Sequence, residues 1–124
     1  MRHVLHLPYP PSINNYWIAS GHRRFISQRG RDFKLAVQEY VAVQQLESFG
    51  GAIVEVNIIL RPRNLRLMDI DNCVKPVLDA LQDAGLFDDD KQVGHVSVRR
   101  GIPIVGGKCI VAVELLSAPE SSEL

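Results

Sequence analysis

The amino-acid sequence predicts an α+β fold of two layers, in which two main helices cover one face of a mixed β-sheet. The hydrophobic pattern changes along the chain, from the alternation of strands to the three- and four-residue spacing of helices and back. Predicted strands also flank the helices instead of alternating strictly with them. With 124 residues, the chain suits one core. We therefore expect a single domain over residues 1–116 and a flexible acidic tail over 117–124.

The N-terminal half begins with a short strand and contains the longer predicted helix. The strand covers residues 3–7 and ends where prolines follow, because proline cannot continue a β-ladder. Residues 12–23 are polar and rich in turn-forming types, which predicts a connection, and residues 23–27 are a candidate second strand. Apolar positions from residue 31 to 46 fit a helical stripe, which a pair of glycines then ends.

The C-terminal half contains the remaining strands and the second helix. Residues 52–61 alternate as a strand with one wetter face. A helix from about residue 72 to 84 directs valines and leucines inward, and a glycine follows it. Residues 92–101 and 108–116 predict two further strands joined by a turn that contains proline and glycine.

Composition narrows the class of protein. Hydrophobic residues make up 46% of the chain and charged residues 23%, as in soluble globular proteins. The first residues contain only a short apolar stretch interrupted by histidines and prolines, which predicts neither a signal peptide nor a membrane span. Two cysteines are too few for a disulfide framework or a four-thiolate zinc site, so we expect a cytoplasmic protein.

Charge is balanced overall but unevenly distributed. The first 34 residues are strongly basic, and Arg61, Arg63 and Arg66 crowd together just before an acidic segment. If a metal ion neutralises some of the aspartates, the remaining surface is basic and suits a nucleic acid. An ordinary mixed surface is the alternative, and charge alone does not choose between them.

The segment LMDIDNCVKP contains the most informative pattern. Asp69 and Asp71 lie one residue apart and would repel unless solvent, an arginine or a metal ion offsets their charge. Hard cations such as Mg²⁺ prefer carboxylate oxygens. Alternatively, Asp71 or Asn72 caps the following helix. A cap explains one of these residues but not Asp69, Lys75 and the acidic run 88–90 together.

Proline shapes the start of the second helix. Pro76 disfavours α geometry at Lys75 and removes a backbone donor. We therefore expect a late or irregular helix start that lets Lys75 point toward the aspartates. Elsewhere, Tyr16 and Trp17 either stack on a nucleobase or fill the edge of the core, and the sequence leaves both options open.

In combination, these motifs resemble the RusA-type Holliday-junction endonucleases, a family found in bacteria and often in prophages. The resemblance covers about residues 5–116 and includes LPYPPSINNYW, the loop RPRN with MDIDN, and DNCVKPVLDALQDAGLFDDDKQV. It implies a homodimer that binds four-way DNA junctions and nicks two strands symmetrically with Mg²⁺, in recombination and repair. It also implies a preferred dinucleotide at the cut, and neither an organic cofactor nor a membrane partner.

The resemblance places the family's essential acids at Asp69, Asp71 and Asp90 and its essential lysine at Lys75, with Asp89 as a further candidate ligand. An additional acid in the run 88–90 leaves the register there open. On this interpretation Mg²⁺ activates water and offsets charge at the phosphate, while Lys75 holds the phosphate or the leaving oxygen. The candidate DNA-contacting residues are Arg23, Arg24, Arg29, Arg31, Arg61, Arg63, Arg66, Asn14, Asn15 and Asn72.

Two other functions compete with this one. Haloacid-dehalogenase-like phosphohydrolases also carry Asp-x-Asp after an apolar strand, but near the N-terminus of a longer chain and followed by Thr or Val. Here the motif begins at residue 69 and is followed by Asn72. The second alternative is a non-catalytic DNA-junction-binding protein with vestigial acids.

The predicted acids lie at opposite ends of one helix. A helix from residue 72 to 84 is about 20 Å long, so Asp71 and Asp90 meet in one chain only if residues 85–90 run back almost fully extended. In a two-fold dimer, neighbouring antiparallel helices would instead bring Asp71 of one subunit to Asp90 of the other. We expect a dimer and favour the shared arrangement.

Overall fold

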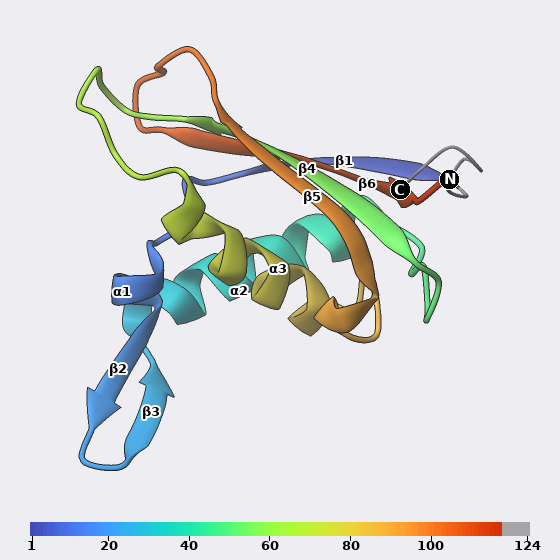
Figure 1. Cartoon of the computed structure of the whole chain (residues 1–124), viewed down its shortest axis with the longest axis horizontal. Helices are drawn as coiled ribbons and strands as arrows, with labels where there is room; N and C mark the ends of the chain where they lie inside the picture. Colours follow the sequence, from blue (N-terminus) through green and yellow to red (C-terminus); the bar gives the residue numbers. More distant parts are fainter. Residues whose placement is uncertain (118–124) are drawn as a thin grey trace, which may run out of the picture.

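A computed structural model describes residues 1–117 and contains one four-stranded sheet and a separate two-stranded ribbon. Figure 1 shows the helices below the sheet and the ribbon projecting at one end. The sheet has the strand order β1-β6-β4-β5. Its members are β1 (Arg2–Leu7), β4 (Val54–Arg61), β5 (Val93–Arg100) and β6 (Lys108–Leu115).

The sheet is mixed because its strands pair in both directions. β4 runs antiparallel to β6 and parallel to β5, and β1 runs antiparallel to β6. At the centre, Val56 is paired with Val113 on one side and with Val96 on the other. The parallel pair needs a long crossover, and the second helix lies within it.

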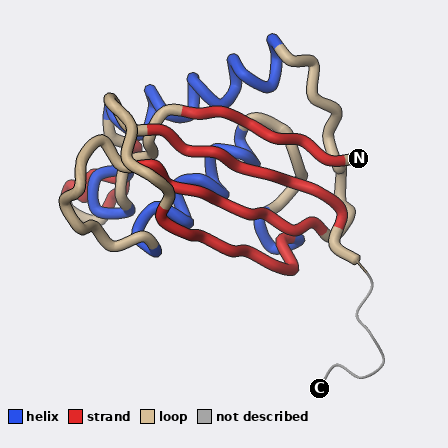
Figure 2. The backbone as a smooth tube through the Cα atoms, turned by 90° about the horizontal axis from the view of Figure 1, so that it is seen from above, coloured by secondary structure: helices blue, strands red, loops and turns tan. Residues whose placement is uncertain are grey.

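Two helices cover one face of this sheet, α2 (Gln28–Val43) and α3 (Val74–Asp83). Figure 2 shows them on the same side of the strands. Side chains of β4 alternate between buried and half-buried, as expected for a strand with one covered face. Val77 and Leu81 of α3 are fully buried with Val37 of α2 and the inner strand residues. The predicted α+β arrangement is confirmed.

A polar network fixes the two helices to the chain that follows β1. Lys34 on α2 forms ion pairs of 3.4 and 3.5 Å with Asp79 and Asp83 on α3. The hydroxyl of Tyr16, the last residue of α1 (Ile13–Tyr16), donates a 2.6 Å hydrogen bond to Asp79. Burial and this carboxylate raise the pKa of Tyr16 above its ordinary value. Tyr16 therefore belongs to the core rather than to a stacking surface.

The structure differs from prediction between residues 12 and 31. The expected connection over 12–23 contains α1 and β2 (Trp17–Ser20), and β2 pairs with β3 (Arg23–Ile26). Helix α2 begins at Gln28, earlier than expected, because the Ser27 hydroxyl accepts a 3.0 Å hydrogen bond from the Gly30 amide.

Helix α2 ends at Val43, earlier than the predicted limit of residue 46. The predicted tail over 117–124 lies, apart from Ser117, outside the described residues. Within the described part of the chain, none of the helices combines the length and apolarity needed to cross a membrane.

Candidate functional site

Asp69 and Asp71 lie where the loop after β4 enters a 3₁₀ turn, η1 (Asp71–Cys73), and both are exposed. The Arg100 guanidinium donates to the Met68 carbonyl and ties this loop to β5. Neither η1 nor α3 has a side-chain cap, so the alternative in which Asp71 or Asn72 caps the helix is wrong. Neither Asp71 nor Asn72 therefore has a capping role.

The predicted irregular helix start is confirmed. The 3₁₀ turn runs directly into α3 at Val74, and Pro76 occupies the third position of the helix. Proline is tolerated in a first helical turn because its missing N–H would have no intrahelical partner there. Lys75 precedes it, and its ammonium donates to the Asp90 carboxylate.

Asp90 lies alongside α3. Its backbone N–H donates a 2.9 Å hydrogen bond to the Gln82 side chain, and its carboxylate accepts from Lys75. Gln82 and Lys75 are about 10 Å apart along the helix axis, so Asp90 lies beside the helix between them. The hydrogen bond from the Lys75 ammonium lowers the pKa of Asp90, which remains ionised at neutral pH.

The other two aspartates of the acidic run have different surroundings. Asp89 caps the 3₁₀ turn η2 (Asp90–Gln92): its carboxylate accepts from the Lys91 amide at 2.8 Å, and its own amide donates to Gln92 at 2.9 Å. The Asp88 amide donates to the Gly50 carbonyl at 3.1 Å. Only Asp90 of the three forms an ion pair with a lysine within residues 1–117, whereas the sequence predicts only that Lys75 points toward the aspartates.

A single chain does not bring the three predicted ligands together. Within residues 1–117, no three His, Cys, Asp or Glu side chains converge as a group that could hold a metal ion. Asp69 and Asp71 lie at the N-terminal end of α3, whereas Asp90 follows its C-terminal end and lies along its side. The donor chemistry nevertheless fits a hard cation, since carboxylate oxygens are its preferred ligands and an ammonium already contacts Asp90.

The predicted DNA-contacting residues fall into two groups. The first group lies on α1, β3 and the first turn of α2 and consists of Asn14, Asn15, Arg23, Arg24, Arg29 and Arg31. The second group runs from the end of β4 to η1 and consists of Arg61, Arg63, Arg66 and Asn72. Two arginines also hold the backbone: Arg31 donates to the Ile26 carbonyl at 2.8 Å, and Arg61 to the Ile102 carbonyl at 2.9 Å.

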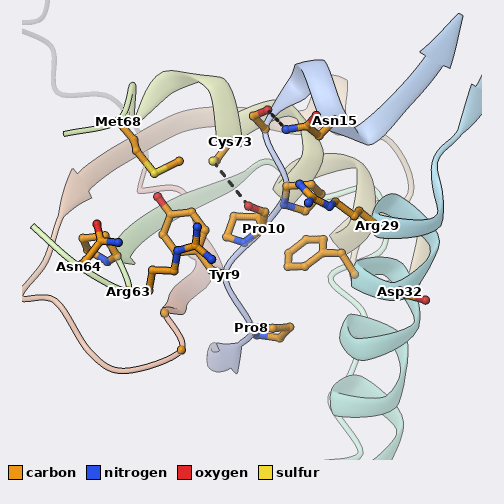
Figure 3. Close-up of a pocket in the computed structure, with 16 residues that line it drawn as sticks. Pro8, Tyr9, Pro10, Asn15, Arg29, Asp32, Arg63, Asn64, Met68 and Cys73 are labelled. Carbon is orange, nitrogen blue, oxygen red and sulfur yellow. Dashed lines mark hydrogen bonds between the residues drawn. The ribbon is translucent and has the colours of Figure 1, made fainter. Parts of the chain in front are cut away.

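A pocket of about 460 Å³ lies between these groups. Figure 3 shows Arg29 and Asn15 on one side, Arg63 and Asn64 on the other, and the Tyr9 ring between them. Met68, which precedes Asp69, also lines it. Sequence reasoning missed Tyr9 and the pocket, although the prolines around Tyr9 signal a rigid connection.

The two cysteines are buried, and their thiols are unreactive. Burial raises the pKa of the Cys73 thiol to about 11 and that of Cys109 to about 12. Both are free thiols.

The family model and the individual relatives that match this chain all carry the same family description. A family model described as endodeoxyribonuclease RusA matches residues 8–115. The chain is 33% identical over 112 residues to a crossover junction endodeoxyribonuclease of Enterobacteria phage HK97, covering 90% of this chain and 93% of that protein. Over 101 residues it is 33% identical to the protein of that name from Enterobacteria phage 82 and 32% identical to that from Escherichia coli K12; both alignments cover 82% of this chain and 83% of the relative.

Proposed function

Because the chain belongs to the endodeoxyribonuclease RusA family, we propose that it resolves four-way (Holliday) DNA junctions by paired symmetric nicks, in recombination and repair. The observation that carries this proposal is the placement of Asp69, Asp71, Lys75 and Asp90 around one helix, in a chain that matches the family from residue 8 to 115. The family match excludes the haloacid-dehalogenase-like alternative.

The proposed cofactor is Mg²⁺, with Asp69, Asp71 and Asp90 as its ligands and Asp89 as a capping residue beside them. When bound, the ion supplies an activated water and positive charge at the scissile phosphate. The Lys75 ammonium contacts Asp90, and we propose that it holds a phosphate oxygen when the ion and the DNA are bound.

We propose that the protein acts as a homodimer whose subunits share each metal site. Two symmetric nicks require two sites, and a two-fold axis supplies them. Within residues 1–117, the acids of one chain do not converge as a group that could hold a metal ion, which supports a contribution from the partner. Asp71 of one subunit would then lie near Asp90 of the other.

Mixing an Asp71→Asn subunit with an Asp90→Asn subunit is expected to restore single nicks. In a shared arrangement, one of the two heterodimer sites contains both native acids and the other contains both lesions. Nicking of a labelled junction by the mixture, compared with each variant alone, measures this. If each site belonged to one chain, every site would carry one lesion and the mixture would stay inactive.

Binding to a junction is expected to weaken steeply with salt, because arginine–phosphate contacts release counterions. Each contact contributes about −0.9 to the slope of log affinity against log salt on duplex arms. Arg63→Glu should flatten this slope and leave the cut position unchanged. Arg2→Glu is the matched control, since Arg2 lies at the opposite end of the sheet (Figure 1).

Titration of junction binding across several salt concentrations gives both slopes. Equal slopes for Arg63→Glu and the unchanged protein would show that the loop after β4 does not contact DNA.

A further inference from the structure

The β2–β3 ribbon, residues 17–26, projects away from the sheet and helices (Figure 1). Within residues 1–117 its strands pair only with each other, an arrangement that is marginally stable in water by itself. Its base is anchored: the Ser27 amide donates a 2.9 Å hydrogen bond to the carbonyl of buried Tyr16. The ribbon is therefore a firmly attached projection from the core.

One face of the ribbon carries an exposed apolar pair. Ile18 and Phe25 lie directly opposite each other in the register, with 53% and 48% of their surfaces exposed. The alternation of side chains places Trp17 and Arg24 on the other face, where the Arg24 guanidinium lies 4.7 Å from the Trp17 ring. Water is a poor partner for the Ile18–Phe25 pair, which indicates a ligand with an apolar face.

The surroundings of this pair are basic. His22, Arg23 and Arg24 form or follow the turn, and no Asp or Glu precedes Asp32 in the chain. Within residues 1–117, neither Arg23 nor Arg24 forms an ion pair. An apolar pair flanked by uncompensated cations complements DNA, in which apolar base faces lie between phosphates, better than it complements the apolar surface of another protein.

The ribbon begins beside the candidate active site. α1, which leads into β2, packs against η1 and α3, and η1 contains Asp71. Each ribbon strand has four residues and spans roughly 13 Å at 3.3 Å per residue. The tip therefore lies about four base steps, at 3.4 Å per step, from the base of the ribbon.

We propose that this ribbon is a wedge that enters the centre of the junction and stacks Ile18 and Phe25 on base pairs unstacked at the crossover. The inference rests on the proposed function. A two-stranded ribbon fits a DNA groove, and apolar side chains inserted between base steps unstack them. In an intact duplex the base faces already stack on each other, whereas the crossover is the point at which stacking is interrupted. The wedge thereby favours a junction over a duplex.

The test uses the double variant Ile18→Thr with Phe25→Thr in an Asp71→Asn background, which separates binding from cleavage. The probe is a synthetic four-way junction with 2-aminopurine at the crossover, whose fluorescence rises when the base unstacks. Threonine preserves the strand preference of the ribbon. The emission of Trp17, the single tryptophan of the chain, reports whether the ribbon is intact.

Saturating Asp71→Asn protein is expected to raise the fluorescence severalfold, and the double variant should lose most of this rise and about tenfold in junction affinity. Leu35→Gln, at a position of similar exposure on α2, should retain both. Phe25→Trp should retain the rise because it keeps an aromatic face.

Four results would overturn the wedge. Binding without a fluorescence rise in the Asp71→Asn protein overturns the wedge alone, and so does an undiminished rise in the double variant. A shift from dimer to monomer in the double variant would assign the apolar pair to a second copy of the chain. Failure of the Asp71→Asn protein to bind any junction would overturn the proposed function as well.

Discussion

Asp71→Asn is expected to lower the rate of Mg²⁺-dependent junction cleavage by at least about 100-fold, while junction binding is retained or strengthened. Loss of residues that merely support a metal ligand costs 10- to 100-fold, so loss of a ligand itself costs more. Binding survives because removing a carboxylate also removes its repulsion of phosphate. Asp69→Asn should behave in the same way.

Single-turnover cleavage and a gel-shift assay on one labelled junction separate the two effects. Glu39→Gln serves as the matched control, since it removes one exposed carboxylate from α2. Cleavage at a near-native rate by either aspartate variant would show that the metal assignment is wrong. The same assay addresses the remaining alternative, a non-catalytic junction-binding protein, because such a protein would bind without turnover before any substitution.

The largest effect on stability is expected at the inner face of α3. Leu81 is completely buried between the helix and the sheet, so Leu81→Ala should lower the free energy of unfolding by about 2–5 kcal/mol. The loss combines the transfer energy of the missing methyl groups with the cost of a cavity. Leu35→Ala, at a position 54% exposed on α2, should change it by less than about 0.5 kcal/mol.

Urea unfolding at one protein concentration measures both variants, because self-association would make stability depend on concentration. Equal losses at the two positions would contradict the packing described for α3. Since α3 carries Lys75 and Gln82, Leu81→Ala should also weaken the placement of Asp90.

Elements with a long periodic pattern were predictable from the sequence, and short polar elements were not. β4 and α3 each carry a clear pattern of buried positions, so their type and approximate limits were predicted. β2 has only four residues and lies in a segment predicted to be a connection, whereas its pairing partner β3 matches the candidate strand over residues 23–27. The ribbon is defined by contacts between its two strands, and a segment rich in polar and turn-forming residues has no clear pattern from which these contacts can be predicted.

Part of the candidate site was likewise predictable from the sequence, and part was not. The spacing of Asp69, Asp71 and Lys75 predicts a site, and Pro76 predicts the irregular helix start that the structure contains. The neighbours of Asp90 were not predictable, because they depend on where the chain turns after α3. The contact from Asp90 to Gln82 returns the chain to α3, and the contact from Asp88 to Gly50 joins segments far apart in sequence.

Cleavage of a synthetic four-way junction, with Mg²⁺ and with a chelator instead, tests the central claim most directly. A linear duplex with the same arm sequences is the control substrate. The protein should make two symmetric nicks in the junction when Mg²⁺ is present, make none in the chelator, and leave the duplex uncut. An uncut junction in Mg²⁺, or equal cutting of junction and duplex, would contradict the proposed function.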